Sequence, residues 1–228
     1  LLREVHHSTH EFIYLRKVVS GYQDLVKAGV RLKNQRAALM RAFGKAKSEK
    51  EIDDQAASFV LVGQDEGITA YEAEKKRYEK EFSRLCKKYR MLKNLKSCPG
   101  LKDISAVKVA AAVVDPRRFS SKGKFLAYCG LVKYEKISGG SSYGRVRTNY
   151  SRTLKNVFDI AAAACIQASD DNFLKKDYNY LINEKRLPTH HARHAIARKA
   201  ATIAWGVMKS GKRFDRNKRR KDQSKKQK

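Results

Sequence analysis

The sequence is short of cysteine, of acidic residues and of long apolar runs, and each shortage excludes a class of protein. Its four cysteines are widely spaced and form no CxxC pair, so a disulfide scaffold or a zinc site is not expected and a reducing, cytoplasmic setting is the default. No apolar run approaches the ~20 residues of a membrane span, and no signal-peptide core is present. Only 23 residues are acidic against 51 Lys and Arg, which gives the 228-residue chain a formal net charge of +28. This charge predicts a polyanionic partner, for which nucleic acid is the best fit.

The positive charge is concentrated in two segments. Residues 117–157 hold ten bases and one acid, and residues 209–228 hold eleven bases and two acids. Residues 47–81, by contrast, hold ten acids and six bases. This asymmetry indicates a basic working face and an acidic spacer. The chain opens with Leu1 in helical sequence, and we expect it to be part of a longer protein.

Apolar residues at helical spacing predict that residues 1–97 form an antiparallel coiled-coil hairpin. One stripe covers residues 12–43, with a register slip partway, and a second covers residues 78–92. Residues 48–67 between them contain two aspartates and two glycines, which predicts a loop or a broken helical tip. Such arms serve as structural packing, as spacers or as dimerisation surfaces, and the pattern does not choose among these roles.

Residues 98–211 are predicted to form a second, mainly helical domain, and residues 212–228 are predicted to form a basic disordered tail. The helices expected from caps, prolines and glycines cover residues 104–114, 124–129 and 152–168, a segment that ends at 183, and residues 189–209. Their expected caps include Ser120 or Ser121, Ser151, and Asp170 or Asp171. Residues 131–146 are rich in Gly and Ser with Val, Tyr and Ile, which predicts short strands or an extended loop. The predicted fold class is therefore mainly α with a short β insertion.

Residues 92–114 have the layout of a helix-hairpin-helix. One helix ends at Pro99-Gly100, a tight turn follows, and the backbone N–H groups that open the next helix can hold a phosphate. Lys102 stands where the usual hairpin has a second glycine; it can contact phosphate directly but takes a positive φ less readily. The alternative is an ordinary corner between two helices, without nucleic-acid contact.

A second cluster places Ser138 beside Gly139 among several bases. A serine hydroxyl can attack a phosphodiester, and guanidinium groups can neutralise the charge of the pentavalent transition state. Simple docking of a phosphate is the alternative. The residues predicted to contact nucleic acid are Gly100, Lys102, Lys133, Lys136, Gly139, Arg145, Arg147 and Arg152.

The histidines near the start of the last expected helix do not predict a metal site. His190 and His194 have the i, i+4 spacing of a metal-binding pair, but no Glu lies between them and Arg193 adds positive charge. A helix start that faces nucleic acid or solvent is the preferred interpretation. No metal ligand is therefore predicted in this chain.

Several short motifs occur in the order and spacing of one known module. They are Cys98-Pro99-Gly100, Asp115-Pro116-Arg117-Arg118-Phe119, Ala127-Tyr128-Cys129-Gly130-Leu131, Ser138-Gly139 and Ala197-Arg198-Lys199. Together they resemble the C-terminal domain of insertion-sequence transposases whose N-terminal domain is RuvC-like, with Asp-Glu-Asp-Asp acids. Piv-type DNA invertases and bridge-RNA-guided recombinases belong to the same group. Residues 10–45 resemble the coiled-coil segment that joins the two domains. With both parts counted, the resemblance covers nearly all of the chain up to about Phe214.

The resemblance implies a DNA recombinase with a composite active site. In that family an acidic RuvC-like cluster binds Mg²⁺, while a serine of the C-terminal domain attacks DNA and forms a phosphoserine link. That serine corresponds to Ser138, with Ser141 and Ser142 as weaker candidates, and the Mg²⁺-binding acids have no counterpart in this chain. Lys102 and Tyr150 depart from the family, which usually has glycine at both positions.

The expected partner is therefore DNA, and the sequence leaves open whether a guide RNA is used. Coiled-coil arms favour a homodimer or homotetramer, and the expected location is the cytoplasm, in association with the nucleoid. Without its metal-binding half, the chain is expected to bind DNA or RNA but not to cut it. The alternative function is a non-catalytic nucleic-acid-binding protein in which the helix-hairpin-helix, residues 133–147 and the tail grip phosphates.

Overall fold

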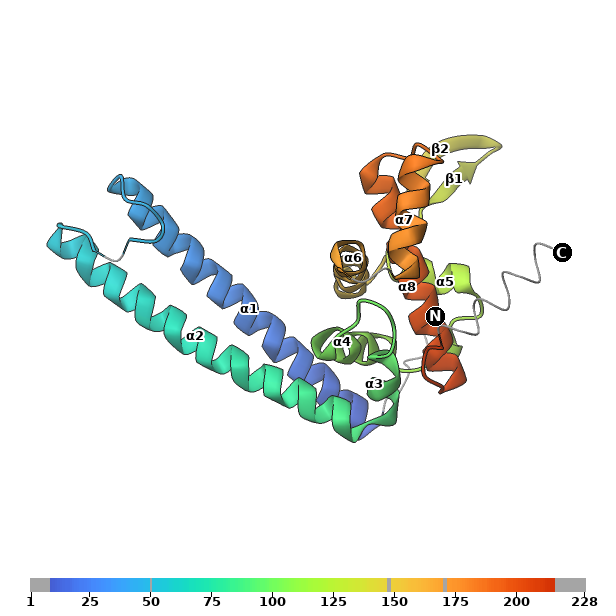
Figure 1. Cartoon of the computed structure of the whole chain (residues 1–228), viewed down its shortest axis with the longest axis horizontal. Helices are drawn as coiled ribbons and strands as arrows, with labels where there is room; N and C mark the ends of the chain where they lie inside the picture. The colour runs from blue at the N-terminus through green and yellow to red at the C-terminus, as the bar shows by residue number, and fades with distance from the viewer. Residues whose placement is uncertain (1–8, 50, 147–148, 170–171, 216–228) are drawn as a thin grey trace.

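The computed structural model describes residues 9–49, 51–146, 149–169 and 172–215, and this part of the chain is mainly helical, as predicted. Two long helices form an arm, and the other elements pack into a body at its base (Figure 1). The elements are α1 (His10–Ala42), α2 (Gln55–Lys88), α3 (Arg90–Leu95), α4 (Asp103–Val113), the 3₁₀ helix η1 (Pro116–Arg118), α5 (Lys122–Tyr128), β1 (Tyr134–Ser138), β2 (Ser141–Val146), α6 (Arg152–Gln167), α7 (Phe173–Asn183) and α8 (Thr189–Ser210). None of the described helices combines the length and apolar character needed to cross a bilayer.

In the arm, α1 and α2 lie side by side and antiparallel, which confirms the predicted helical hairpin (Figure 1). Two glycines of α1 explain the irregular apolar stripe. A Cβ at Gly29 would overlap the ring of Tyr71, and a Cβ at Gly21 would overlap the hydroxyl of Tyr78. These glycines therefore allow two aromatic side chains of α2 to pack directly on the α1 backbone.

At the tip of the arm, α2 begins well before the end of the loop predicted over residues 48–67. The Asp54 carboxylate accepts a 2.7 Å hydrogen bond from a backbone N–H of the first turn, and the helix then continues through Gly63 and Gly67. Leu61, which is only 2% exposed, packs in a small buried cluster at the tip. The prediction of a loop or broken helix holds for the described residues before Gln55 and was wrong for residues 55–67, because this cap and this burial offset the roughly 1 kcal/mol that each helical glycine costs.

The body is built around α4. Six of its eleven residues are buried, and it packs against α1, α2, α3 and α6. Leu15, Val19 and Tyr22 of α1 belong to the same buried cluster as the α4 side chains. The base of the arm is thus part of the main core, and the boundary proposed near residue 97 lies within continuous packing.

Capping hydrogen bonds confirm two of the predicted helix starts in the body. The hydroxyls of Ser121 and Ser151 each accept a hydrogen bond from an N–H in the first turn of the following helix. The start of α7 corrects the prediction, because its cap is Asn172, whereas residues 170–171 lie outside the described part of the chain. Asn172 is buried, and its amide also donates a 2.8 Å hydrogen bond to the Cys165 carbonyl, which ties the cap to α6.

The chain after α8 also differs from the expectation. Phe214 donates a 2.7 Å backbone hydrogen bond to the Ser97 hydroxyl, and its ring centroid lies 5.8 Å from that of Phe173. Residues 212–215, which were expected to belong to the disordered tail, are instead held against the body. The rest of the predicted tail, residues 216–228, lies outside the described residues.

Substitution of Gly100 tests the packing of the body. Gly100 has φ +75°, and a Cβ there would overlap the Ala161 carbonyl oxygen of α6. Gly100→Ala should lower the free energy of unfolding by more than about 2 kcal/mol, because backbone overlap adds to the ~1–2 kcal/mol cost of a left-handed conformation. Chemical denaturation measures the loss. Gly44→Ala is the matched control, since Gly44 has φ +64° with nothing within 4 Å; an equal loss in both variants would contradict the close contact.

Thiol reactivity tests the same core independently. All four cysteines are buried, and burial raises the pKa of the Cys86 thiol and of the Cys98 thiol to about 12. Because the thiolate is the reactive form, a raised pKa keeps these thiols protonated and slow to react near neutral pH. A thiol-specific reagent should therefore label the folded chain far more slowly than the unfolded chain. Labelling at the same rate in both states would show that this core is not formed.

Candidate nucleic-acid interface

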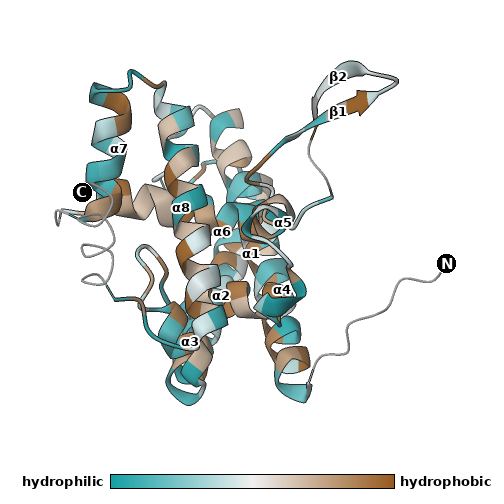
Figure 2. Cartoon of the chain, turned by 90° about the vertical axis from the view of Figure 1, so that its right-hand side faces the viewer, coloured by the Kyte–Doolittle hydropathy of each residue, from teal (hydrophilic) through white to brown (hydrophobic). Residues whose placement is uncertain are grey.

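Ser138 lies at the tip of a β-hairpin. Strands β1 and β2 are antiparallel, Ser138 pairs with Ser141, and the chain turns through Gly139 (φ +57°) and Gly140 (φ +77°). Positive φ at both central residues is the signature of a type I′ turn, the connection that suits two twisted strands. The hairpin projects away from the body beside α5 (Figure 2). The predicted short strands in residues 131–146 are confirmed.

The tip leaves Ser138 accessible. The residue is exposed, and a Cβ built on Gly139 or Gly140 would meet nothing within 4 Å. Within the described part of the chain, no side chain forms a hydrogen bond with the Ser138 hydroxyl. A nucleic-acid strand can therefore approach this hydroxyl without displacing protein atoms.

Ser142, one of the weaker candidates, has a different environment. Its hydroxyl donates a 2.7 Å hydrogen bond to the Glu135 carboxylate and lies 3.3 Å from the Gly144 amide nitrogen, which donates to it. A carboxylate at this distance can accept the proton of an attacking serine. Ser138 has the more open position, whereas Ser142 has a proton acceptor.

The predicted basic residues are placed only in part. Lys133 is exposed just before β1, Lys136 belongs to β1, and Arg145 belongs to β2. In the register of the hairpin, Arg145 lies opposite Glu135. Arg147 lies outside the described residues. The hairpin thus carries two of the predicted phosphate contacts, with Lys133 at its root, and their contact with nucleic acid stays a prediction.

The predicted helix-hairpin-helix consists of α3, a turn and α4. Gly100 contacts the α6 backbone, so helix packing alone accounts for this glycine. Lys102 is exposed at the start of α4 and is available to a phosphate. Asp103 follows it and pairs with Lys96, and a carboxylate at a helix N-terminus opposes the binding of another anion. Helix packing thus accounts for the glycine at position 100, and the contact of Gly100 and Lys102 with a phosphate stays a prediction.

Tyr150 and Arg152 lie where the chain returns to the body. The Tyr150 ring occupies the space that a Cβ on Gly130 would need, and the backbone of Ser151 donates a 2.8 Å hydrogen bond to the Tyr128 carbonyl. Gly130 thus makes room for the tyrosine ring that this chain has at position 150. Arg152 is exposed at the start of α6, on the rim of an open pocket that His194 also lines.

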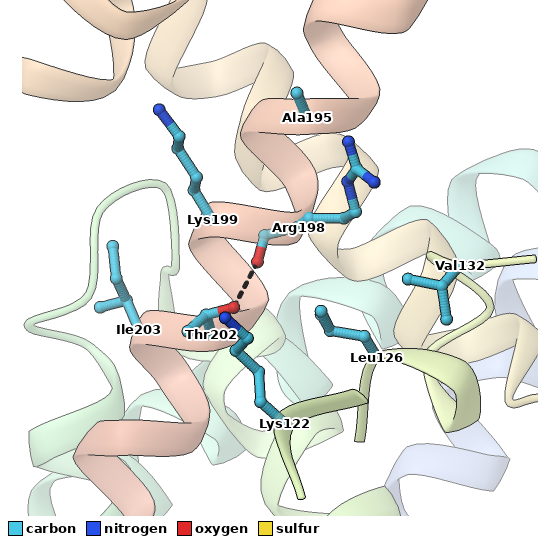
Figure 3. Close-up of a pocket in the computed structure, with 8 residues that line it drawn as sticks. All are labelled: Lys122, Leu126, Val132, Ala195, Arg198, Lys199, Thr202 and Ile203. Carbon is cyan, nitrogen blue, oxygen red and sulfur yellow. Dashed lines mark hydrogen bonds between the residues drawn. The ribbon is translucent and has the colours of Figure 1, made fainter. Parts of the chain in front are cut away.

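An open pocket of about 510 Å³ lies between α5 and α8, next to the root of the hairpin (Figure 3). Lys122, Arg198 and Lys199 are its basic residues, and Val132, just before the hairpin, lines one side. Lys199 pairs with Asp177 at 2.8 Å. Arg198 is exposed, and none of the described carboxylates forms an ion pair with it.

Sequence reasoning did not predict this pocket as a contact surface. Arg198 and Lys199 entered only through a motif shared with a known module, and Lys122 was passed over. The available signal was that these two adjacent bases lie among the alanine-rich core positions of α8. Such a pair must lie at the edge of the buried face, where it borders a neighbouring element.

Two of the histidines at the start of α8 lie close to each other. The rings of His190 and His191 lie 4.1 Å apart between centroids, and Arg193 pairs with Asp159. The described residues contain no group of three or more His, Cys, Asp or Glu side chains that could hold a metal ion.

An exposed hairpin and a basic pocket on a helical body are features of a nucleic-acid-binding protein. Residues 92–179 match the model of the Transposase IS116/IS110/IS902 family. The match covers less than half of the chain, begins in α3, ends in α7 and includes the Ser138 hairpin. It supports an insertion-sequence transposase, a class of protein that acts on DNA. No curated protein matches the chain.

Neutralising Arg198 tests the pocket as a DNA contact. Arg198→Ala should weaken binding to a short DNA duplex and lower the slope of log affinity against log salt by about 1, because one phosphate contact is lost. Anisotropy titrations at several salt concentrations measure the slope. Arg31→Ala removes the same charge from an exposed position of α1 and should leave the slope unchanged. If the two variants lose affinity equally, the pocket is not a specific contact.

Proposed function

We propose that this chain is the DNA-binding and catalytic-serine part of a transposase that cuts and rejoins DNA strands when an insertion sequence moves. The observation that carries the proposal is the family match over residues 92–179, which contains an exposed serine at a hairpin tip. Ser138 is the proposed nucleophile. The proposed location is the cytoplasm, in association with the nucleoid.

The proposed chemistry is a phosphoryl transfer to serine. The Ser138 Oγ forms a bond to phosphorus, one P–O ester bond of the DNA strand breaks, and the departing strand hydroxyl gains the proton that the serine loses. Attack of a strand hydroxyl on the phosphoserine reverses these changes and rejoins the DNA. The bases of the hairpin neutralise the charge that develops on the phosphate oxygens. Arg198, at the root of the hairpin, holds a different phosphate of the same DNA.

The resemblance also implies Mg²⁺, and the described residues do not fit a magnesium site. No group of three or more potential ligands is present among them, so we assign no step of this chain to a metal. We propose that the metal-binding acids belong to another part of the whole protein. On its own, this chain then binds DNA or RNA and does not cut it.

Self-association through the arm is part of the same proposal. Phe59 is 83% exposed and Val62 is 55% exposed, and both lie on α2 near the tip of the arm. Exposed apolar side chains of this size favour contact with another surface. We therefore propose a homodimer or homotetramer. Whether the protein also binds a guide RNA is a separate question, which binding measurements with RNA and DNA probes in parallel answer.

A second candidate function is a non-catalytic nucleic-acid-binding protein. Its supporting observation is that no described side chain is placed to take a proton from Ser138. In that case the hairpin and the basic pocket hold phosphates, and Ser138 contributes little. The two functions differ in their dependence on the serine rather than in affinity.

Serine substitutions in the whole protein separate these functions. Ser138→Ala should lower strand transfer by more than about 10³-fold, because the nucleophile is lost, and should leave DNA affinity unchanged. Ser141→Ala and Ser142→Ala are matched controls on the same hairpin and should remain active. Recombination of a substrate that carries the ends of the element is the measurement.

The other outcomes are equally informative. Activity in Ser138→Ala together with inactivity in Ser142→Ala would move the nucleophile to Ser142, with Glu135 as its proton acceptor. Activity in all three variants, combined with loss of binding on charge reversal at Arg145 and Arg147, would support the non-catalytic function.

A further inference from the structure

A second basic surface lies at the opposite side of the body from the serine hairpin's root. Six bases line an open pocket of about 550 Å³ where α2 meets α3 and where the chain leaves α8. They are Lys87, Lys88, Arg90, Lys93, Lys212 and Arg213, and no acidic residue lines the pocket. We call these six residues the α3 cluster.

Two polar contacts hold the α3 cluster together. The Asn94 side chain, which is 6% exposed, donates a 2.7 Å hydrogen bond to the Gly211 carbonyl. The Ser97 hydroxyl accepts a 2.7 Å hydrogen bond from the Phe214 backbone. These anchors lie on either side of Lys212 and Arg213, so the structure fixes two cations from the end of the chain beside the four from α2 and α3.

This arrangement concentrates charge of one sign. All six side chains are exposed, and none forms an ion pair with a carboxylate among the described residues. Lys88 lies over the Tyr89 ring at 5.2 Å, and the nearby Glu81 carboxylate is hydrogen-bonded by Arg84. Because like charges held close together repel one another, a bound polyanion stabilises the cluster.

We propose that the α3 cluster is a second nucleic-acid site, separate from the Ser138 hairpin, that binds consecutive phosphates of a phosphodiester backbone. This inference rests on the proposed function only for the choice of nucleic acid as partner, and it does not depend on Ser138. No large exposed apolar residue of the described chain lies on α3 or after α8, although a surface that inserts into a membrane needs such residues.

Helix α8 connects the two basic surfaces. Arg198 lies in the pocket beside the hairpin root, and Gly211, which ends the same helix, lines the pocket of the α3 cluster. The two positions are about 20 Å apart along the helix axis. A continuous helix keeps this spacing fixed, so nucleic acid bound at the α3 cluster has a defined position relative to the hairpin.

The test removes two cations of the α3 cluster, one on α3 and one in the segment that follows α8. In the full chain, Lys93→Ala combined with Arg213→Ala should lower the slope of log affinity against log salt by about 2, since two phosphate contacts are lost. The probes are a short random-sequence DNA duplex and an RNA duplex of the same sequence. Loss with DNA, with RNA or with both supports the site and identifies which backbone it takes.

The control pair is Lys47→Ala combined with Lys80→Ala, which removes the same charge from exposed positions on the arm. It should leave the slope unchanged, and an equal loss in both pairs would overturn the proposal. Weaker binding to anionic phospholipid vesicles, without any change toward nucleic acid, would also overturn it. Circular dichroism of both pairs verifies the helical fold.

A third variant separates this inference from the proposed function. Ser138→Ala should retain the full slope, because its hydroxyl carries no charge. If Ser138 proves dispensable for strand transfer, the loss in the α3-cluster variant still supports the second site. If that variant keeps the full slope while Ser138→Ala is inactive, the second site alone is overturned.

Discussion

The burial of α4 is the constraint on which the rest of the structure depends. Its Val107, Val109 and Ala110 side chains are fully buried, and the helix contacts α1, α2, α3 and α6. Small and β-branched side chains leave room for these neighbours to approach, and next to α4 the turn at Gly100 touches the α6 backbone directly. The arm and the helices that carry the basic surfaces are all positioned through this core.

Charge is divided between the arm and the body in a way that suits a polyanionic partner. The arm pairs its acids internally, as in Lys33–Glu72, Arg36–Asp65 and Arg84–Glu81. In the body, Arg198 and the α3 cluster have no such partners among the described residues. The acid-rich stretch seen in the sequence therefore offsets much of the positive charge of the arm, and most of the excess positive charge remains on the body, where nucleic acid is proposed to bind.

The features that could be predicted from the sequence are those that depend on residues close to one another along the chain. The caps at Ser121 and Ser151 and the short strands within residues 131–146 follow from local chemistry, and the structure confirms them. Asn172 was missed because tertiary burial, not local sequence, selects it as a cap. The α3 cluster was missed because Asn94 joins it to Gly211 across 117 positions, a contact for which the sequence gives no periodic signal.

The central claim is that Ser138 becomes covalently linked to DNA, and mapping that link tests it most directly. The whole protein is incubated with DNA that carries the ends of its element, the reaction is denatured, and the DNA is digested. Mass spectrometry then locates the residual nucleotide on the protein. The account predicts a phosphodiester on Ser138. A nucleotide on any other residue, or active recombination with no covalent adduct at all, would contradict it.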